Sequence, residues 1–328
     1  MVRGKFNIAA ALLGLGFAGI VAASPAAAAT AYASKSGSDS NTCASPLTPC
    51  LTLNAALSQA IAGGGFDRIV ILGPGIFNES LSVTSSIEII GDGSHFQAIY
   101  PGAGNTAITV DSGGAGDFRL SNIQLLGTMG DVGGASTGLS ILSANFVNID
   151  NVEMHGFGTN AISFTPTNQY PTLTILNSVI GDGYGFAIHP TTAQYPNVQI
   201  NNTTFRNCWS YCVRADASAM TSGQFLAVNI TNSLLYDAFT NNVTAVSTAS
   251  SGFAGVKLDG STANYAGQAG VNANGQNTVI SLNKSAIVDN ATGVNILNGG
   301  KVASFGNNDI SGNITDLSGG SLTAAALK

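Results

Sequence analysis

One short pattern recurs nine times between residues 87 and 310: apolar, any, apolar, any, Asn, any, any, apolar. The clearest copies span Phe118–Leu125, Val147–Met154, Leu173–Ile180, Val198–Phe205 and Val228–Leu235. Weaker copies place Gly91, Gly260, Lys284 and Asn307 in the Asn position, and successive Asn positions are 23 to 31 residues apart. A period of this length is typical of a solenoid, in which each repeat buries its apolar face only against its neighbours.

Each repeat has the same predicted plan of three short strands. One strand precedes the Asn position, a second follows it, and a third comes after a turn of variable length, as in Gly138–Ile141, Gly185–Ile188, Ser210–Val213 and Gly293–Ile296. We therefore expect an all-β parallel β-helix with three strands per coil, whose variable turns build one face. The repeats run almost throughout the chain, which predicts one structural domain.

The Asn position has a structural interpretation. A bend between two strands needs a residue that tolerates unusual backbone angles and bonds to the backbone, and Asn does both. Strands of stacked coils are about 4.8 Å apart, so the amides are expected to bond to one another along the axis.

The N-terminal part is predicted to differ from the repeats. Residues 1–29 combine Arg3 and Lys5, an apolar run and a small-residue end, which is the pattern of a secretory signal peptide; a membrane anchor is the alternative. Residues 30–65 are expected to hold a first strand, a Cys-containing loop and a short helix over Leu53–Ile61 that caps the solenoid. Residues 66–328 are the predicted β-helix.

Composition limits the partners. Without residues 1–29 the chain has nine basic and 17 acidic residues, a net charge of −8. Nucleic acid is an unsuitable partner, because its binding requires Lys or Arg to displace counterions. A strongly anionic glycan would also need a local basic patch. No later apolar stretch is long enough to cross a bilayer. These features predict an exported protein, periplasmic or extracellular.

The four cysteines form two close pairs. Cys43 and Cys50 flank a Pro-containing loop, and Cys208 and Cys212 lie within one repeat. Export implies an oxidising compartment, so two disulfides are predicted. For Cys208 and Cys212 the tightness of the loop leaves unpaired thiols as the alternative.

Several segments resemble the right-handed parallel β-helix proteins of the pectin lyase-like superfamily. They are Tyr32–Cys43, Pro49–Ala56, Ile69–Glu79 and Ile87–Gly93, followed by the Asn repeats. The resemblance implies the handedness and the fold over nearly all of the mature chain. It implies little about reaction, because the superfamily includes polysaccharide lyases, hydrolases, esterases and epimerases together with non-catalytic exported proteins.

Alignment on the Asn position gathers candidate site residues in the central coils. The proposed catalytic residues are Asp182, Asp237, Arg206, Arg214 and His189. Asp182 and Asp237 lie two coils apart, near the wide end of the separation used for inverting glycoside hydrolysis. The alternative chemistry is β-elimination, in which an Arg stabilises an enolate. The structural alternative is that the Asp and Asn residues are turn residues.

The proposed substrate-binding residues are Trp209, Tyr211, Tyr184 and Asn207, because aromatic faces stack on sugar rings. No metal site is predicted. Asp182, Asn207 and Asp237 offer oxygen ligands for Ca²⁺, but without a specific motif. The string Tyr184–Pro190 resembles a Tyr-Gly-Phe-Asp-Pro-His motif of alginate epimerases, yet Ala187 stands where that motif has its catalytic Asp.

The sequence thus favours an exported carbohydrate-active or carbohydrate-binding β-helix, with a groove over the central coils. If it is an enzyme, a polysaccharide lyase or glycoside hydrolase is expected. The competing hypothesis is a non-catalytic cell-surface or matrix protein that uses its long flank for adhesion.

Overall fold

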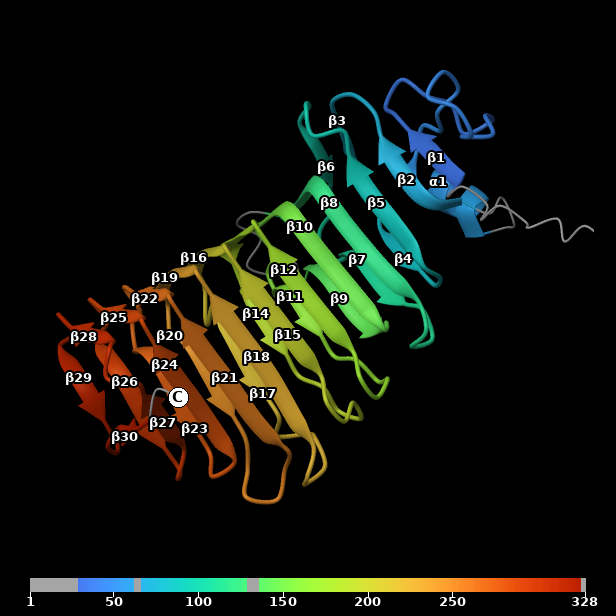
Figure 1. The fold of residues 1–328 in the computed structure, drawn as a ribbon. Helices are drawn as coiled ribbons and strands as arrows, with labels where there is room; N and C mark the ends of the chain where they lie inside the picture. Colours follow the sequence, from blue (N-terminus) through green and yellow to red (C-terminus); the bar gives the residue numbers. More distant parts are fainter. Residues whose placement is uncertain (1–28, 62–65, 129–135, 326–328) are drawn as a thin grey trace, which may run out of the picture.

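The chain winds into a parallel β-solenoid of about nine coils with one short helix at its N-terminal end (Figure 1). The computed structural model describes residues 29–61, 66–128 and 136–325. The predicted signal peptide lies outside these residues, apart from Ala29. The architecture confirms the parallel β-helix that the Asn repeats predicted.

Strands of successive coils pair in parallel to form three ladders, and a complete coil contributes one strand to each ladder, while the end coils contribute to fewer. Ladder 1 precedes the Asn position and consists of β1 (Ala29–Ala33), β2 (Phe66–Ile71), β5 (Ile87–Gly91), β8 (Asp117–Leu126), β10 (Phe146–His155), β12 (Thr172–Leu176), β15 (Asn197–Asn201), β18 (Phe225–Thr231), β21 (Phe253–Asp259), β24 (Thr278–Asn283), β27 (Lys301–Ser304) and β30 (Thr323–Ala324).

Ladder 2 follows the Asn position. It consists of β3 (Gly75–Phe77), β6 (Gln97–Ile99), the second halves of β8 and β10, then β13 (Val179–Gly183), β16 (Thr204–Cys208), β19 (Leu234–Ala238), β22 (Thr262–Asn264), β25 (Ala286–Val288) and β28 (Asp309–Ser311).

Ladder 3 forms the second sheet. It consists of β4 (Leu81–Val83), β7 (Thr106–Asp111), β9 (Thr137–Ser143), β11 (Asn160–Phe164), β14 (Phe186–Ile188), β17 (Val213–Asp216), β20 (Asn241–Val246), β23 (Ala269–Asn274), β26 (Thr292–Leu297) and β29 (Thr315–Ser318).

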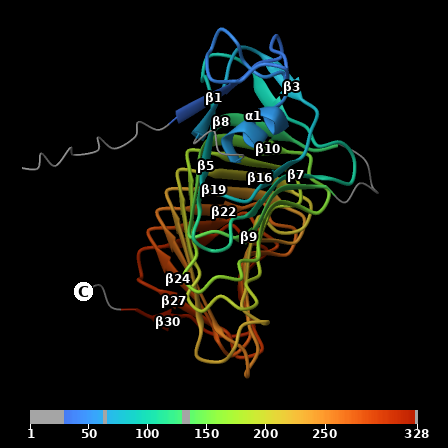
Figure 2. The ribbon, with the colours of Figure 1, turned by 90° about the vertical axis from the view of Figure 1, so that its right-hand side faces the viewer.

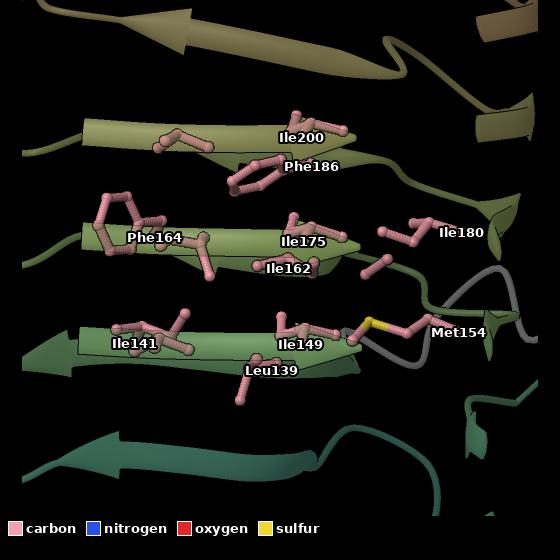
Figure 3. Packing of buried hydrophobic residues seen from close by; sticks show 14 of the residues in the cluster. Leu139, Ile141, Ile149, Met154, Ile162, Phe164, Ile175, Ile180, Phe186 and Ile200 are labelled. Carbon is pink, nitrogen blue, oxygen red and sulfur yellow. The ribbon is translucent and has the colours of Figure 1, made fainter. Parts of the chain in front are cut away.

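The core is a set of apolar columns that run along the solenoid axis. In ladder 1, Ile149, Ile175 and Ile200 are register partners and lie directly above one another (Figure 3). In ladder 3, Ile162 pairs with Phe186 in the same way. Burying one methylene group contributes about 0.8 kcal/mol, so the repeated apolar positions supply most of the driving force for stacking.

The bend between ladders 1 and 2 carries the Asn positions, which we call the first bend column. Its left-handed residues are Asn122, Asn151, Asn177, Asn202, Asn232, Gly260 and Lys284. Positive φ is costly for most residues and least so for Gly and Asn, which explains the Asn preference.

The predicted amide ladder in this column is present in part. Asn151 Nδ2 donates to Asn122 Oδ1 and Asn202 Nδ2 donates to Asn177 Oδ1, each at 2.8 Å. Asn177 instead donates to Asp150 Oδ1 of the preceding coil. The column is therefore continuous as a backbone bend but interrupted as a chain of amides.

A second, internal ladder lies one residue beyond the first bend column. Ser178, Ser233, Ser261 and Ser285 are buried, and each hydroxyl accepts from a backbone N–H of the preceding coil at 3.2–3.3 Å. These bonds satisfy donors that the bend removes from the strand ladders, which a buried backbone requires.

The N-terminal end is closed by α1 (Leu53–Gln59), which lies across the first coils (Figure 2). Thr52 caps the helix by accepting from Ala55 N, and the Glu79 carboxylate accepts from the N–H groups of Leu53 and Asn54 at 2.8 Å. A carboxylate is favourable at a helix N-terminus because unpaired N–H groups point towards it. The predicted capping helix is confirmed, although it ends two residues earlier than expected.

Both predicted disulfides are present, Cys43–Cys50 beside α1 and Cys208–Cys212 at the end of β16. Within the described ranges, no helix has the length and apolar character needed to cross a membrane.

Candidate functional site

The chain bends a second time between ladders 2 and 3, and this second bend column carries the Asp residues predicted for catalysis. Its left-handed residues are Gly156, Asp182, Asn207, Asp237, Tyr265, Asp289 and Gly312. Asp182, Asn207 and Asp237 therefore occupy a bend, as the structural alternative expected. Their side chains are nevertheless accessible on one edge, so a turn position does not exclude a role in binding.

Asp182 is the centre of a charged group on ladder 2, the ladder 2 cluster, formed by His155, Asp182, Arg206 and Asn207. Asp182 Oδ1 accepts from Asn207 Nδ2 at 2.6 Å, while Oδ2 lies 3.3 Å from an Arg206 guanidinium nitrogen and 3.1 Å from His155 Nδ1. The four residues come from three successive coils. The sequence prediction named three of them, and the structure adds His155.

Gly181 makes room for this cluster. A Cβ atom at Gly181 would lie 2.1 Å from the Arg206 carbonyl oxygen and 2.8 Å from Arg206 Cγ. Because Gly181 has no side chain, the Arg206 chain can cross the preceding strand and reach Asp182. The glycine is thus part of the geometry of the cluster.

The electrostatics keep Asp182 ionised. Burial raises the pKa of the Asp182 carboxyl, but the hydrogen bond from Asn207 and the charges of Arg206 and His155 outweigh burial and hold the pKa below its usual 3.8. A carboxyl of this kind suits a hydrogen-bond acceptor or a base. It does not suit the proton donor of glycoside hydrolysis, which requires a raised pKa.

A second charged group, the ladder 3 cluster, consists of His189, Arg214 and Asp216. Asp216 Oδ2 lies 2.6 Å from an Arg214 guanidinium nitrogen and 3.4 Å from His189 Nδ1. Asp216 Oδ1 accepts from the Ser218 N–H at 2.9 Å. His189 and Arg214 were both predicted as catalytic residues, and Asp216 contacts both of them.

Asp216 is the only charged residue that is fully buried among the described residues, with 4% of its surface exposed. Burial raises the pKa of its carboxyl, but the bonds from Ser218 and the Arg214 guanidinium outweigh burial and lower it. A buried carboxylate is stable only with such partners. Arg214 and His189 are each about two-fifths exposed, so the cluster reaches the surface.

Aromatic side chains lie at the corner between the two clusters. The strand register pairs Gly183 with Cys208 and Cys208 with Ala238. The residues that follow these three therefore occupy equivalent positions on successive coils. We call this set, Tyr184, Trp209 and Phe239, the aromatic corner. Trp209 meets Tyr184 edge to face at 6.3 Å, and Phe239 is 75% exposed.

Tyr211 connects this corner to the ladder 3 cluster. Arg214 lies over its ring at 5.8 Å, and its hydroxyl donates to Asn160 Oδ1 at 3.1 Å. The predicted binding residues Trp209, Tyr211 and Tyr184 are therefore brought together by the fold.

Two shallow hollows flank the ladder 2 cluster. One has a volume of about 360 Å³ and is lined by Asn207, Cys208, Trp209, Asp237 and Phe239. The other, of about 160 Å³, lies on the N-terminal side and is lined mainly by His95, Phe96, Gln97, Gln124 and Glu153 with neighbouring bend residues. Both open widely to the surface.

Contacts join the hollows into one surface, the polar strip. Gln124 Nε2 donates to Glu153 Oε2 at 2.8 Å, and Glu153 Oε2 lies 3.4 Å from His155 Nε2. His155 then contacts Asp182, as described. The strip crosses six successive strands of ladder 2 (β6, β8, β10, β13, β16 and β19), which is about 24 Å at the usual strand spacing.

Asp237 stands apart from Asp182. Asn207 lies between them in the column, so the two carboxylates are two strand spacings apart, about 9.6 Å. Asp237 lines the larger hollow and is exposed.

The Asp182 oxygen atoms already accept from two nitrogen donors. A guanidinium nitrogen of Arg206 and the amide nitrogen of Asn207 both point at Asp182, where a cation would be repelled. In the described ranges, no group of three or more His, Cys, Asp or Glu side chains has an arrangement that could hold a metal ion.

Comparison with known proteins shows similarity in fold but not in sequence. No protein-family model and no curated protein matches the sequence. Among solved structures, the pectate lyase Pel9A is similar over 90% of this chain and 77% of its own, with a TM-score of 0.53 and 15% identity. The A-module of Azotobacter vinelandii mannuronan C-5 epimerase AlgE4 (84% and 96% covered, TM-score 0.46, 13% identity) and the Dettilon tailspike protein (90% and 68%, 0.42, 12%) are more distant.

The chain therefore shares its right-handed parallel β-helix fold with the pectate lyase Pel9A. At 15% identity the likeness concerns architecture, and the chemistry of this chain has to be argued from its own side chains.

Proposed function

We propose that this is an exported β-helix protein that binds an elongated polysaccharide along the polar strip and the aromatic corner. The observation that carries the proposal is the continuous series of contacts from Gln124 to Asn207, which joins two hollows into one surface over six successive strands. A polymer needs an extended, open surface, whereas a small ligand is usually enclosed in a cleft. The two disulfides support export, because such bonds persist in oxidising compartments.

The chemistry of the strip suits sugars. Tyr184, Trp209 and Phe239 supply large apolar surfaces, and the first two also carry a polar group at the rim. Asn207, Gln124 and Asp237 offer donors and acceptors for hydroxyl groups. The strip combines both on adjacent strands, so sugar rings and their hydroxyls can be contacted together.

The local charge favours a glycan without acidic groups. Arg206 is the strip's one fixed positive charge, against the carboxylates of Glu153, Asp182 and Asp237. The carboxylate of Asp182 already neutralises Arg206 at 3.3 Å. A polyanionic chain would meet net repulsion here, in a protein that is acidic overall.

Cleavage of the bound glycan is a second candidate function. Asp, Arg and His side chains are in mutual contact in both clusters, and two carboxyl groups have perturbed pKa values, a combination that marks functional sites. Asp182 stays ionised, so hydrolysis would assign the proton donor to Asp237 and the base to Asp182. β-Elimination would require a uronate in place of the neutral glycan favoured above; Arg206 or Arg214 would then stabilise the enolate, and His189 is the base candidate beside Arg214.

The test is binding and turnover on a polysaccharide panel. The mature protein is incubated with neutral and acidic polysaccharides, with and without Ca²⁺, while affinity electrophoresis reports retention. Absorbance of unsaturated uronates and new reducing ends report the two reactions. We expect retention by a neutral polysaccharide that strengthens with oligosaccharide length up to the span of the strip.

The controls separate the alternatives. Trp209→Ala should lose retention, and Lys257→Ala, which changes an exposed residue on ladder 1 outside the strip, should keep it. Retention without new products identifies a binding protein. Failure of every glycan to be retained would contradict the proposal and favour a non-catalytic adhesion or matrix protein that recognises another surface.

A further inference from the structure

The Cys208–Cys212 disulfide encloses the two aromatic residues that connect the aromatic corner to the ladder 3 cluster. Cys208 ends β16, Trp209 and Tyr211 lie within the loop, and Cys212 precedes β17. Both cysteines are buried, with 1% and 0% of their surface exposed. The bond therefore lies beneath a surface loop that exposes Trp209 and leaves Tyr211 half-buried.

Comparison of adjacent coils shows where the bond occurs. Gly183 and Cys208 are register partners, as are Phe186 and Val213, so the loop between ladders 2 and 3 has two residues in the earlier coil and four in the later one. The added residues bring Tyr211 onto the surface. The disulfide thus appears in the coil where the loop lengthens.

The following coil has a loop of the same length but no disulfide. Ala238 occupies the position of Cys208, and Asn242 occupies that of Cys212. Asn242 is fully buried and its Nδ2 donates to the carbonyl of Asn264 at 2.8 Å. Cys212 Sγ lies 3.9 Å from the carbonyl of Tyr236, which is the register partner of Asn264. A buried Asn therefore ties the end of this loop to the following coil without joining the two ends of the loop.

The longer loop is packed tightly against the coil before it. A Cβ atom at Gly185 would lie 2.3 Å from the Tyr211 carbonyl oxygen and 2.4 Å from that of Cys212. Trp209 N donates to the carbonyl of Gly183 at 2.9 Å, which fixes the start of the loop. These contacts hold the loop in one position against the preceding coil, and the disulfide joins the two ends of the loop.

We infer that the Cys208–Cys212 disulfide is a positioning device for the glycan site, which holds Trp209 and Tyr211 in the orientation that contacts the ligand. This inference rests on the proposed function. A disulfide that closes so short a loop removes little entropy from the unfolded chain, so its main effect is local order. Breaking it should weaken binding more than it weakens the fold.

The variant that tests the inference copies the neighbouring coil. Cys208→Ala with Cys212→Asn installs the Ala238 and Asn242 pair, and the new amide can donate to the carbonyl of Tyr236. Trp209 is the only tryptophan in the chain, so its fluorescence reports on this loop alone. We expect greater quenching by acrylamide, lower anisotropy and about fivefold weaker glycan binding, because two side chains must be ordered on association.

The matched control removes the other disulfide with Cys43→Ala and Cys50→Ala. That bond lies beside α1, away from the site, so Trp209 quenching and glycan affinity should stay at the wild-type values. Unchanged quenching and unchanged affinity in the Cys208→Ala, Cys212→Asn variant would overturn the inference while leaving the proposed function intact. If the wild-type protein binds no glycan, the proposed function fails, and the inference is overturned with it as a statement about ligand binding, whatever the quenching shows.

Discussion

The two bend columns have the same backbone conformation and very different side chains. The first bend column is nearly uniform, with Asn in five of its seven left-handed positions, and three of these Asn side chains donate to another Asn or to Asp150. The second contains Gly, Asp, Asn and Tyr, and there Asp182 gathers an Arg and a His from adjacent coils.

This difference teaches where to look for function in a solenoid. A bend position on which the stacking of coils depends has the same structural requirement in every coil, so the same residue type recurs there. A position that needs only a left-handed backbone leaves the side chain free to vary. Variation in the second column is therefore where recognition can be built.

Replacing an Asn of the first bend column should have the largest effect. Asn202→Ala keeps a non-Gly residue in the left-handed region without the local polar contacts of Asn, and it removes the bond to Asn177. We expect a loss of about 2–3 kcal/mol in the free energy of unfolding. Chemical denaturation monitored by circular dichroism measures it. Asn202→Gly should lose less, and equal losses for both variants would argue against backbone strain as the cause.

Truncation in the aromatic corner should separate binding from stability. Trp209→Ala removes an exposed aromatic face beside the second bend column, and we expect about 2 kcal/mol of binding free energy to be lost, roughly a 30-fold weaker affinity. The midpoint of denaturation should barely move. Isothermal titration with the retained glycan provides the affinity, and a large loss of stability without loss of affinity would contradict the assignment.

The buried carboxylate should control the response to acid. The pKa values of Asp216 and Asp182 are lowered in the folded protein, so their stabilisation is complete above the unfolded value of 3.8 and is lost as pH falls through the folded values. Asp216→Asn should cost about 1–2 kcal/mol at neutral pH and flatten the fall in stability below pH 4. Denaturation midpoints measured from pH 6 to pH 2 test this, and an unchanged slope would exclude Asp216 as a source.

Two substitutions within the second bend column should have the smallest effects on the free energy of unfolding. Asp182→Asn removes a charge from the ladder 2 cluster and should cost about 1 kcal/mol, because the exposed Arg206 keeps part of its hydration. Asp237→Asn should change stability by less than about 0.5 kcal/mol, since an exposed Asn is equally suited to the bend. Equal effects would show that the cluster contributes nothing beyond the turn.

The fold was predictable because its determinants are local and repeated. The spacing of Ile149, Ile175 and Ile200 relative to their Asn positions already defines both the strands and the register between coils. The capping helix could be predicted from the helical spacing of apolar residues after Cys50. The internal Ser ladder was not predicted, because Ser178 and its equivalents look like ordinary turn residues until the strands are stacked.

The site was predictable only where the Asn alignment held. Counting from Asn177 and Asn202 correctly placed Asp182 beside Asn207 and Arg206. Beyond the variable turns that count fails, because loops of different length intervene.

Asp216 was not among the predicted site residues. Its burial depends on the packing of the segment after β17, which no spacing rule describes. Phe239 was missing from the predicted binding residues for a similar reason, since only the pairing of Cys208 with Ala238 places it on the coil next to Trp209.

The pairing of every coil with its immediate neighbours has a consequence for motion. Opening of a solenoid begins at its ends, where a coil has one neighbour instead of two, and proceeds inward. The coils that carry the ladder 2 cluster lie between the end closed by α1 and the final strands β28 and β30. Amide hydrogens of β13 and β16 should therefore exchange with solvent more slowly than those at either end, and the surface that recognises ligand is the part of the molecule that opens least often.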